Sequence, residues 1–333
     1  MWDFSLTGAL ALMARTAPFL LFRMAVYFGM ACAYVIATGT GAAIGYGVGQ
    51  LGDEGFLASS TALGGITGFG LVAAVLYLLR EYVLYIVKAG HIAVLIELLD
   101  GRVLPEGEGQ VAYGSRMVRE RFAQASLLFG IDQLVKGVIS AIAGLIEGIA
   151  SFLPVPGLQA AAGLLRNFLN VAVGFTDEVV LAHAMRTRAV NPWASAEEAL
   201  VLYGQNYKTM FRNAAWLAVM IYGLSFVVFL LALAPAAALV YLMPGALSAG
   251  GLVFAILFAW AFKAALLEPL AITCMMQVFF RTTEGQVPDP AWRARLQDLS
   301  GKFREIGGKA RDWASARAGA SRSTTASALG DFR

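Results

Sequence analysis

Long, mainly apolar stretches constrain this chain more than any other feature of its sequence. A helix needs about 20 consecutive apolar residues to cross a bilayer. Only 14% of the 333 residues are charged, against about 25% in soluble domains, and the mean hydropathy is +0.68. We therefore expect an all-α, polytopic integral membrane protein with about six transmembrane helices. The expected spans are residues 17–49, 56–87, 126–153, 157–182, 214–242 and 247–280.

Basic residues fall on one side of this six-span arrangement. The short connections within each successive pair of spans contain no Lys or Arg, and the first of them carries Asp53 and Glu54. Arg15, Lys88 and Arg186 lie in the segments outside these pairs, as do many basic residues after 280. Because cytoplasmic loops are enriched in Lys and Arg, we expect three helical hairpins with both termini in the cytoplasm. The membrane would be the plasma membrane, or the inner membrane in a bacterium.

Two helix starts are predicted outside the spans. Ser195 followed by Glu198 is a capping box, so we expect a helix to begin near Ala196. Asp289 can cap a second helix with Pro290 at its first position. In this second segment, 289–314, apolar residues recur at three- and four-residue steps between basic ones. This pattern predicts an amphipathic helix on the cytoplasmic side.

The amphipathic segment has two interpretations. Its apolar face suits either the anionic leaflet of the membrane or a seam against this protein or a neighbouring subunit. The residues expected to contact lipid or a partner are Trp292, Arg293, Arg295, Lys302, Arg304 and Trp313. We assign residues 1–282 to the transmembrane domain and expect the small, polar segment 315–333 to be disordered.

The expected third span carries a polar stripe. Its polar residues recur at steps of four, four, seven and four, and so fall within about 100° of one helical face. They are Asp132, Lys136, Ser140, Glu147 and Ser151. If the segment folds back through its prolines, charges of opposite sign face each other. The expected pairs are Glu147 with Arg166, Lys136 with Asp177 or Glu178, and Ser140 with Asn170.

Three interpretations of this stripe are open. Paired charges are tolerated in an apolar setting where lone ones are not. The stripes could therefore hold two helices together, or belong to a hairpin that lies in the membrane interface. They could also line a polar pathway or the centre of an oligomer.

Lys263 and Glu268 are charged residues in the last expected span, near its cytoplasmic end. Ionisable residues inside a span suggest a functional site. One interpretation is an ion pair at the membrane surface. The other is that Glu268, followed by Pro269, lies where the helix backbone opens and coordinates a cation.

No enzyme signature is present in the sequence. The phosphate-binding loop, zinc-protease and serine-nucleophile motifs are absent. The two cysteines, Cys32 and Cys274, and the two histidines, His91 and His183, are too scattered to suggest a metal site. We therefore expect no enzymatic activity, no cofactor, no metal and no nucleic-acid partner.

Tyr203-Gly204-Gln205-Asn206-Tyr207 is followed by Arg212-Asn213-Ala214 just before a span, and "MMQVFFRTTEG" follows the last span. With these features, residues 200–285 resemble the choline transporter-like family. The resemblance implies transport of choline or a related amine. Family members have about ten spans, and the first hairpin has no counterpart, so we carry over no substrate-binding residue.

The leading hypothesis is a path or transporter for a small polar or cationic solute, as a homo-oligomer. The alternative is a non-transporting membrane scaffold or interaction protein whose stripes pack helices and whose basic tail binds lipid or partners. The candidate pathway or buried-charge residues are Asp132, Lys136, Glu147, Arg166, Asn170, Asp177, Glu178, Lys263 and Glu268.

Overall fold

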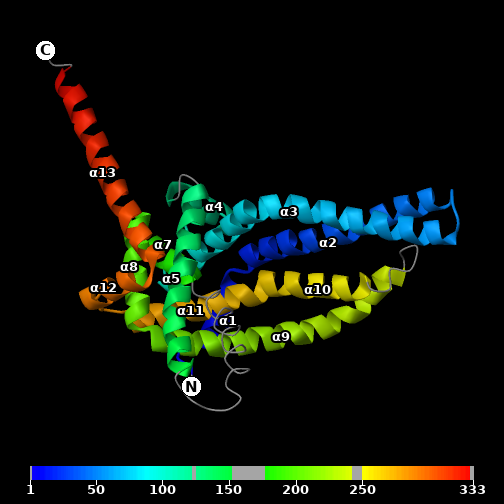
Figure 1. Cartoon of the computed structure of the whole chain (residues 1–333). Helices are drawn as coiled ribbons and strands as arrows, with labels where there is room; N and C mark the ends of the chain where they lie inside the picture. The colour runs from blue at the N-terminus through cyan, green and yellow to red at the C-terminus, as the bar shows by residue number, and fades with distance from the viewer. Residues whose placement is uncertain (1, 122–124, 152–176, 242–249, 331–333) are drawn as a thin grey trace.

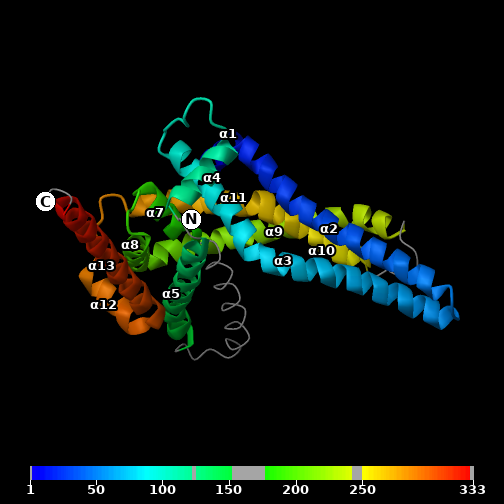
Figure 2. The same cartoon turned by 90° about the horizontal axis from the view of Figure 1, so that it is seen from above.

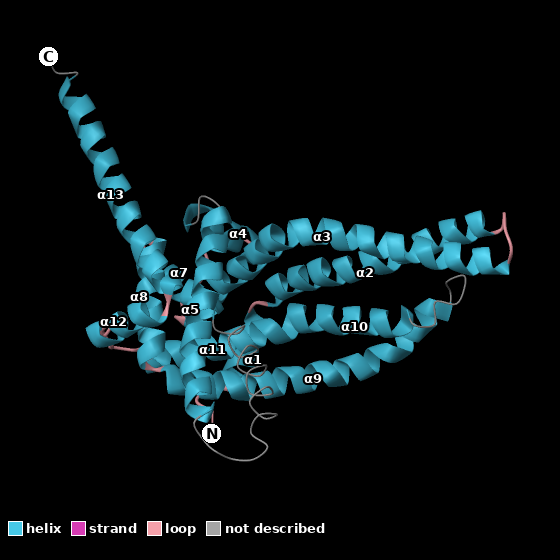
Figure 3. Cartoon of the chain, viewed as in Figure 1, coloured by secondary structure: helices cyan, strands magenta, loops and turns pink. Residues whose placement is uncertain are grey.

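The regular elements of the described residues are all helices (Figures 1 and 3). The computed structural model describes residues 2–121, 125–151, 177–241 and 250–330. This confirms the expected all-α class. The elements are α1 (Leu6–Arg15), α2 (Ala17–Gly49), α3 (Glu54–Leu99), α4 (Gln110–Arg121), α5 (Ala125–Ser151), α7 (Asp177–Arg186), α8 (Pro192–Gln205), α9 (Tyr207–Tyr241), α10 (Gly250–Phe262), the π turn (Lys263–Leu267), α11 (Glu268–Thr282), α12 (Pro290–Leu299) and α13 (Gly301–Gly330).

Four helical segments of the described chain are long and apolar enough to cross a membrane. They are Ala17–Gly49, Glu54–Leu78, Tyr207–Tyr241 and Gly251–Thr282. They form two hairpins, α2 with α3 and α9 with α10, whose helices run side by side in both views (Figures 1 and 2). Large apolar side chains such as Ile36, Leu63 and Leu231 are exposed on them. Such surfaces are compatible with a membrane protein.

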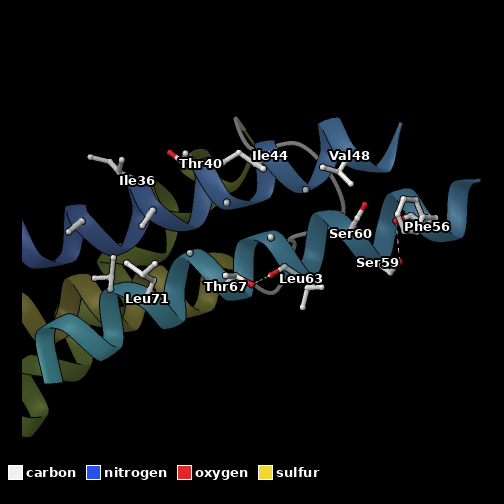
Figure 4. Close-up of a pocket in the computed structure, with 17 residues that line it drawn as sticks. Ile36, Thr40, Ile44, Val48, Phe56, Ser59, Ser60, Leu63, Thr67 and Leu71 are labelled. Atoms are coloured by element: carbon white, nitrogen blue, oxygen red, sulfur yellow. Dashed lines mark hydrogen bonds between the residues drawn. The ribbon is translucent and has the colours of Figure 1, made fainter. Parts of the chain in front are cut away.

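Small residues bring α2 and α3 into backbone contact. A Cβ added at Gly64 would overlap the carbonyl oxygen of Gly41 and lie 2.9 Å from its carbon. A Cβ added at Gly68 would overlap the carbonyl group of Ala37 in the same way. The glycines of this hairpin therefore serve close helix packing. Beside the crossing runs an apolar groove of about 1020 Å³, along which Ile36, Ile44, Leu63 and Leu71 are drawn in Figure 4.

The rest of the described chain forms a helical body at the other end of the hairpins. The main hydrophobic core lies there, and it includes the end of α3, with Ile92, Val94 and Leu95, as well as α7 and α8. In Figure 1 the body lies opposite the α2–α3 connection. Long helices thus join an apolar hairpin region to a body of shorter helices.

The expected third span is a helix, but it is not aligned with the two hairpins. In both views α5 runs across the direction of α2, α3, α9 and α10 (Figures 1 and 2). Its apolar residues Val138, Ile139 and Ile142 are buried against the body, where α5 contacts α7, α8 and α13. Of the expected fourth span, residues 157–176 lie outside the described residues. Its end is the first part of α7, a short helix buried in the body.

The expected tail helix is two helices that pack on their own chain. Asp289 caps α12 by accepting a hydrogen bond from the Ala291 N–H at 2.8 Å, as predicted. Ser300 is extended and separates α12 from α13. Leu296, Phe303 and Ile306 are buried, and α13 contacts α5 and α8. The backbone of α13 continues to Gly330, into the segment for which we expected disorder.

Candidate functional site

A buried arginine connects the two hairpins. Arg23 in α2 is 1% exposed, and its Nη2 donates a hydrogen bond to the carbonyl oxygen of Ala264 at 2.6 Å. Its guanidinium also lies 5.4 Å from the centre of the Tyr27 ring. A buried cation of this kind needs acceptors, since an unpaired one is very costly.

The Ala264 carbonyl is available to Arg23 because the helix changes its hydrogen bonding there. The Glu268 N–H bonds to the carbonyl of Lys263, five residues back, instead of to that of Ala264. The next residue, Pro269, has no N–H and cannot take over this carbonyl. The Glu-Pro sequence thus opens the helix backbone, and Arg23 supplies the missing donor.

The π turn also creates an ion pair. In an α-helix, side chains five residues apart point about 140° away from each other. The wider π turn brings them to one side, so that Lys263 Nζ lies 2.8 Å from Glu268 Oε1. Lys263 also lies 5.2 Å from the ring centre of Tyr222 in α9. The two charges expected in the last span therefore contact each other.

A second ion pair, Lys88 in α3 with Glu178 in α7, lies beside these groups. The charges of both residues act on the Glu268 carboxylate, and Glu178 also acts on Arg23. We call these five residues, Arg23, Lys88, Glu178, Lys263 and Glu268, the charge cluster. It joins α2, α3, α7 and the region of the π turn. Three cations and two anions give it a formal charge of +1.

The charge cluster contains three of the predicted site residues, Glu178, Lys263 and Glu268. It also contains Arg23 and Lys88, which were not predicted as site residues. Arg23 had a usable signal, because it is a single arginine within the apolar run "LLFRMAV". Lys88 had none, since it resembles any basic residue that follows a span.

The other predicted residues of the polar stripes are only partly accounted for. Asp132 is buried and pairs with Lys136 at 2.6 Å, four residues away on α5 itself. Arg166, Asn170 and the side chains of Glu147 and Asp177 lie outside the described residues. The expected contacts of Glu147 with Arg166, of Lys136 with Asp177 or Glu178, and of Ser140 with Asn170 stay predictions.

A neutral histidine lies next to the charge cluster, where α1 meets α2. The His91 ring stacks on Phe19 at 5.0 Å, and its Nε2 lies 3.0 Å from Thr16 Oγ1. The Thr16 hydroxyl already donates to the Met13 carbonyl at 3.1 Å, so it accepts a hydrogen bond from His91 Nε2–H. Burial, together with the charge of Arg23, holds the pKa of His91 well below its usual range.

The residues of the "YGQN" motif hold the tail. Gln205 Nε2 and Asn206 Nδ2 both donate to Gln286 Oε1, at 2.6 and 2.7 Å. Gln205 Oε1 accepts from the Asp289 N–H at 3.1 Å, directly before α12. At Gly204 a Cβ would lie 3.2 Å from the Trp292 ring, so the absence of a side chain there lets α12 pack closely against α8.

The second part of the motif holds the N-terminal segment. Asn213 Nδ2 donates to Asp3 Oδ2 at 2.7 Å, and Asn213 Oδ1 accepts from the Asp3 N–H at 2.7 Å. Arg212 forms an ion pair with Asp3. Ser5 N–H donates to Gln277 Oε1 at 2.9 Å nearby. These motif residues therefore have structural contacts within the chain.

The residues predicted to contact lipid or a partner divide into two groups. Trp292 packs on Tyr207 at 5.6 Å and on the Arg295 guanidinium at 4.9 Å, and Trp313 is half-buried. The basic residues Arg293, Arg295, Lys302 and Arg304 remain exposed. Arg293 also lies 3.6 Å from Glu197. The tryptophans thus serve packing, while the basic surface stays accessible.

Comparison with protein-family models, with curated proteins and with solved structures finds no match. Among the described residues, no group of three or more His, Cys, Asp or Glu side chains could hold a metal ion. The resemblance of residues 200–285 stays a prediction.

Proposed function

We propose that this chain is an integral membrane scaffold, in which two helical hairpins anchor a helical body at the cytoplasmic surface. In this arrangement α2, α3, α9 and α10 cross the bilayer, and α5 lies along the interface with the partly exposed side chain of Lys136 near water. The absence of Lys and Arg from 50–53 and 242–249 supports this orientation. The exposed basic residues of α12 and α13 would contact anionic lipid or an acidic partner.

The pairing of charges within the chain carries this proposal. Lys263 contacts Glu268, Lys88 contacts Glu178, and Arg23 has an acceptor in the backbone of the other hairpin. Each contact joins different helices or helix segments. The first contact spans the π turn, the second joins α3 to α7 of the body, and the third joins the two hairpins, so that the charges are used to hold the helices together.

The cavities along the hairpins support the same function. An open cavity of about 660 Å³ lies along α9 and α10 next to Phe28 of α2, and its lining includes Leu231, Phe258 and Phe262. A polar solute that crosses a membrane needs groups that replace its hydration shell. The apolar lining of this cavity offers none.

A path for a small polar or cationic solute, formed by an oligomer, is a second candidate. The specific observation in its favour is the π turn with its ion pair. Transporters place substrate and ion sites where a membrane helix is interrupted. Here the interruption at Lys263–Leu267 contributes Lys263 to the charge cluster and lies beside its other four residues.

Reconstitution separates the two candidates. The purified full-length chain is placed in liposomes, and uptake of choline and of Na⁺ is measured for wild type, Glu268→Gln and the matched control Glu106→Gln. A scaffold gives no uptake above empty liposomes, and Glu268→Gln lowers its thermal midpoint. Uptake by wild type that Glu268→Gln abolishes, with an unchanged midpoint, would refute the scaffold.

A further inference from the structure

A polar pocket of about 420 Å³ lies in the body, between α7, α8 and the end of α11. Its volume lies within the range of small-molecule sites. Its lining includes His183, Arg186, Glu198, Phe280, Arg281 and Glu284. This pocket differs from the apolar cavities along the hairpins because two arginines and two glutamates lie on its lining.

One lining residue, His183, carries a buried polar atom without a partner. His183 is 8% exposed, and its Nε2 has no hydrogen-bond partner. The nearest carboxylate oxygen, Glu198 Oε1, is 3.8 Å away, which is too far for a hydrogen bond. Burial and the neighbouring Arg186 lower the pKa of His183 to about 4, so the ring is neutral near pH 7. A buried polar atom without a partner is unfavourable, and a ligand in the pocket would relieve this.

The two arginines of the pocket are held in place by other groups. Arg186 pairs with Asp100 at 2.7 Å, and its guanidinium lies 4.3 Å from the ring centre of Phe280. Arg281 Nη1 donates to the Asp3 carbonyl at 3.2 Å. Each guanidinium has five N–H groups, so both retain donors for a ligand.

The lining also carries two carboxylates, Glu198 and Glu284. The arginines come from α7 and α11, whereas Glu198 comes from α8 and Glu284 from the turn after α11. A simple anion in the pocket would meet two carboxylates, and a simple cation would meet two guanidinium groups. Only a ligand with both charges can use both sets of groups.

We propose that this pocket binds a small zwitterion that carries a carboxylate and an ammonium group. Its carboxylate accepts hydrogen bonds from Arg186 and Arg281. Its ammonium group donates to Glu198 or Glu284 and to His183 Nε2. The proposal does not depend on whether the chain conducts a solute, since none of these residues belongs to the charge cluster.

The test uses three molecules of similar size. β-Alanine carries both charges, propionate only the negative one and propylammonium only the positive one. Each is titrated by calorimetry into the full-length chain in detergent. We expect β-alanine to bind about tenfold more tightly than either singly charged molecule. Equal binding of all three, or no binding of β-alanine, would overturn the proposal.

Variants then locate the site. Arg281 and Glu284 are exposed, so Arg281→Gln and Glu284→Gln leave the core intact. Each is expected to weaken β-alanine binding about tenfold, whereas the exposed controls Arg317→Gln and Glu106→Gln leave it unchanged. If both pocket variants bind β-alanine as wild type does, β-alanine does not bind in this pocket.

Discussion

The contact between α2 and α3 predicts opposite outcomes for two glycine-to-alanine substitutions in one helix. Gly64 faces α2, where an added Cβ would overlap the Gly41 carbonyl oxygen and lie 2.9 Å from its carbon. Gly70 is also in α3, but a Cβ there would meet nothing within 4 Å. The two variants therefore share a chemical change and differ only in the space available.

The size of the effect follows from these distances. Nonbonded carbon atoms pack at about 3.5–4.0 Å, so Gly64→Ala must open the crossing by at least about 0.6 Å. Overpacking of this kind destabilises by roughly 1–3 kcal/mol. Replacing a helical glycine by alanine gains about 0.5–1 kcal/mol at either position. The gain cancels between the variants, and Gly64→Ala should be about 1–3 kcal/mol less stable than Gly70→Ala.

Unfolding can be followed through a native thiol. Cys274 is buried and reacts with a fluorogenic maleimide once the protein unfolds, provided that the exposed Cys32 is replaced by serine. In this background we expect Gly64→Ala to unfold at a lower temperature, and Gly70→Ala at the same or a higher one. Equal midpoints for the two variants would show that the crossing is not as close as described.

Three further predictions concern the body and its connections. Arg23→Met should lower the thermal midpoint by leaving a buried carbonyl without its donor, a loss of about 1–3 kcal/mol, whereas the exposed Arg15→Met should not. The stabilising contribution of neutral His183 is fully present above pH 6.5 and is lost as the pH falls to about 4. This loss amounts to about 3 kcal/mol, and pH-dependent unfolding of His183→Gln should lack it. Gln286→Ala should speed proteolysis between α11 and α12, while Gln297→Ala should leave the cleavage rate unchanged.

The parts of the fold that were predicted from the sequence are those encoded by neighbouring residues. The first expected span, 17–49, coincides with α2 because its length and apolar composition define it without reference to the rest of the chain. The start of α12 was predicted as well, because Asp289 and Pro290 act on the adjacent backbone. Local chemistry is sufficient in both cases.

Local sequence signals did not predict the structure where two of them compete, or where a residue contacts a partner that is distant in the chain. The capping box at Ser195 predicted a helix start near Ala196, but α8 begins at Pro192, because the Asn191 side chain caps it earlier. The contact of Arg23 with Ala264 depends on a π turn 241 residues later in the chain. The orientation of α5 likewise depends on what its apolar face packs against, and a polar stripe alone does not reveal that.

The contacts of the N-terminal segment set an order for biosynthesis. Asp3 and its partner Asn213 are separated by 210 residues, and Ser5 and Gln277 by 272. At about 5–20 residues per second, the ribosome needs about 10–40 s to reach Asn213 after it has made Asp3. The residues of the first hairpin are therefore synthesised well before Asn213, and the segment before α1 waits undocked during this time. Its closure onto α9 and α11 is then a late event, coupled to completion of the second hairpin.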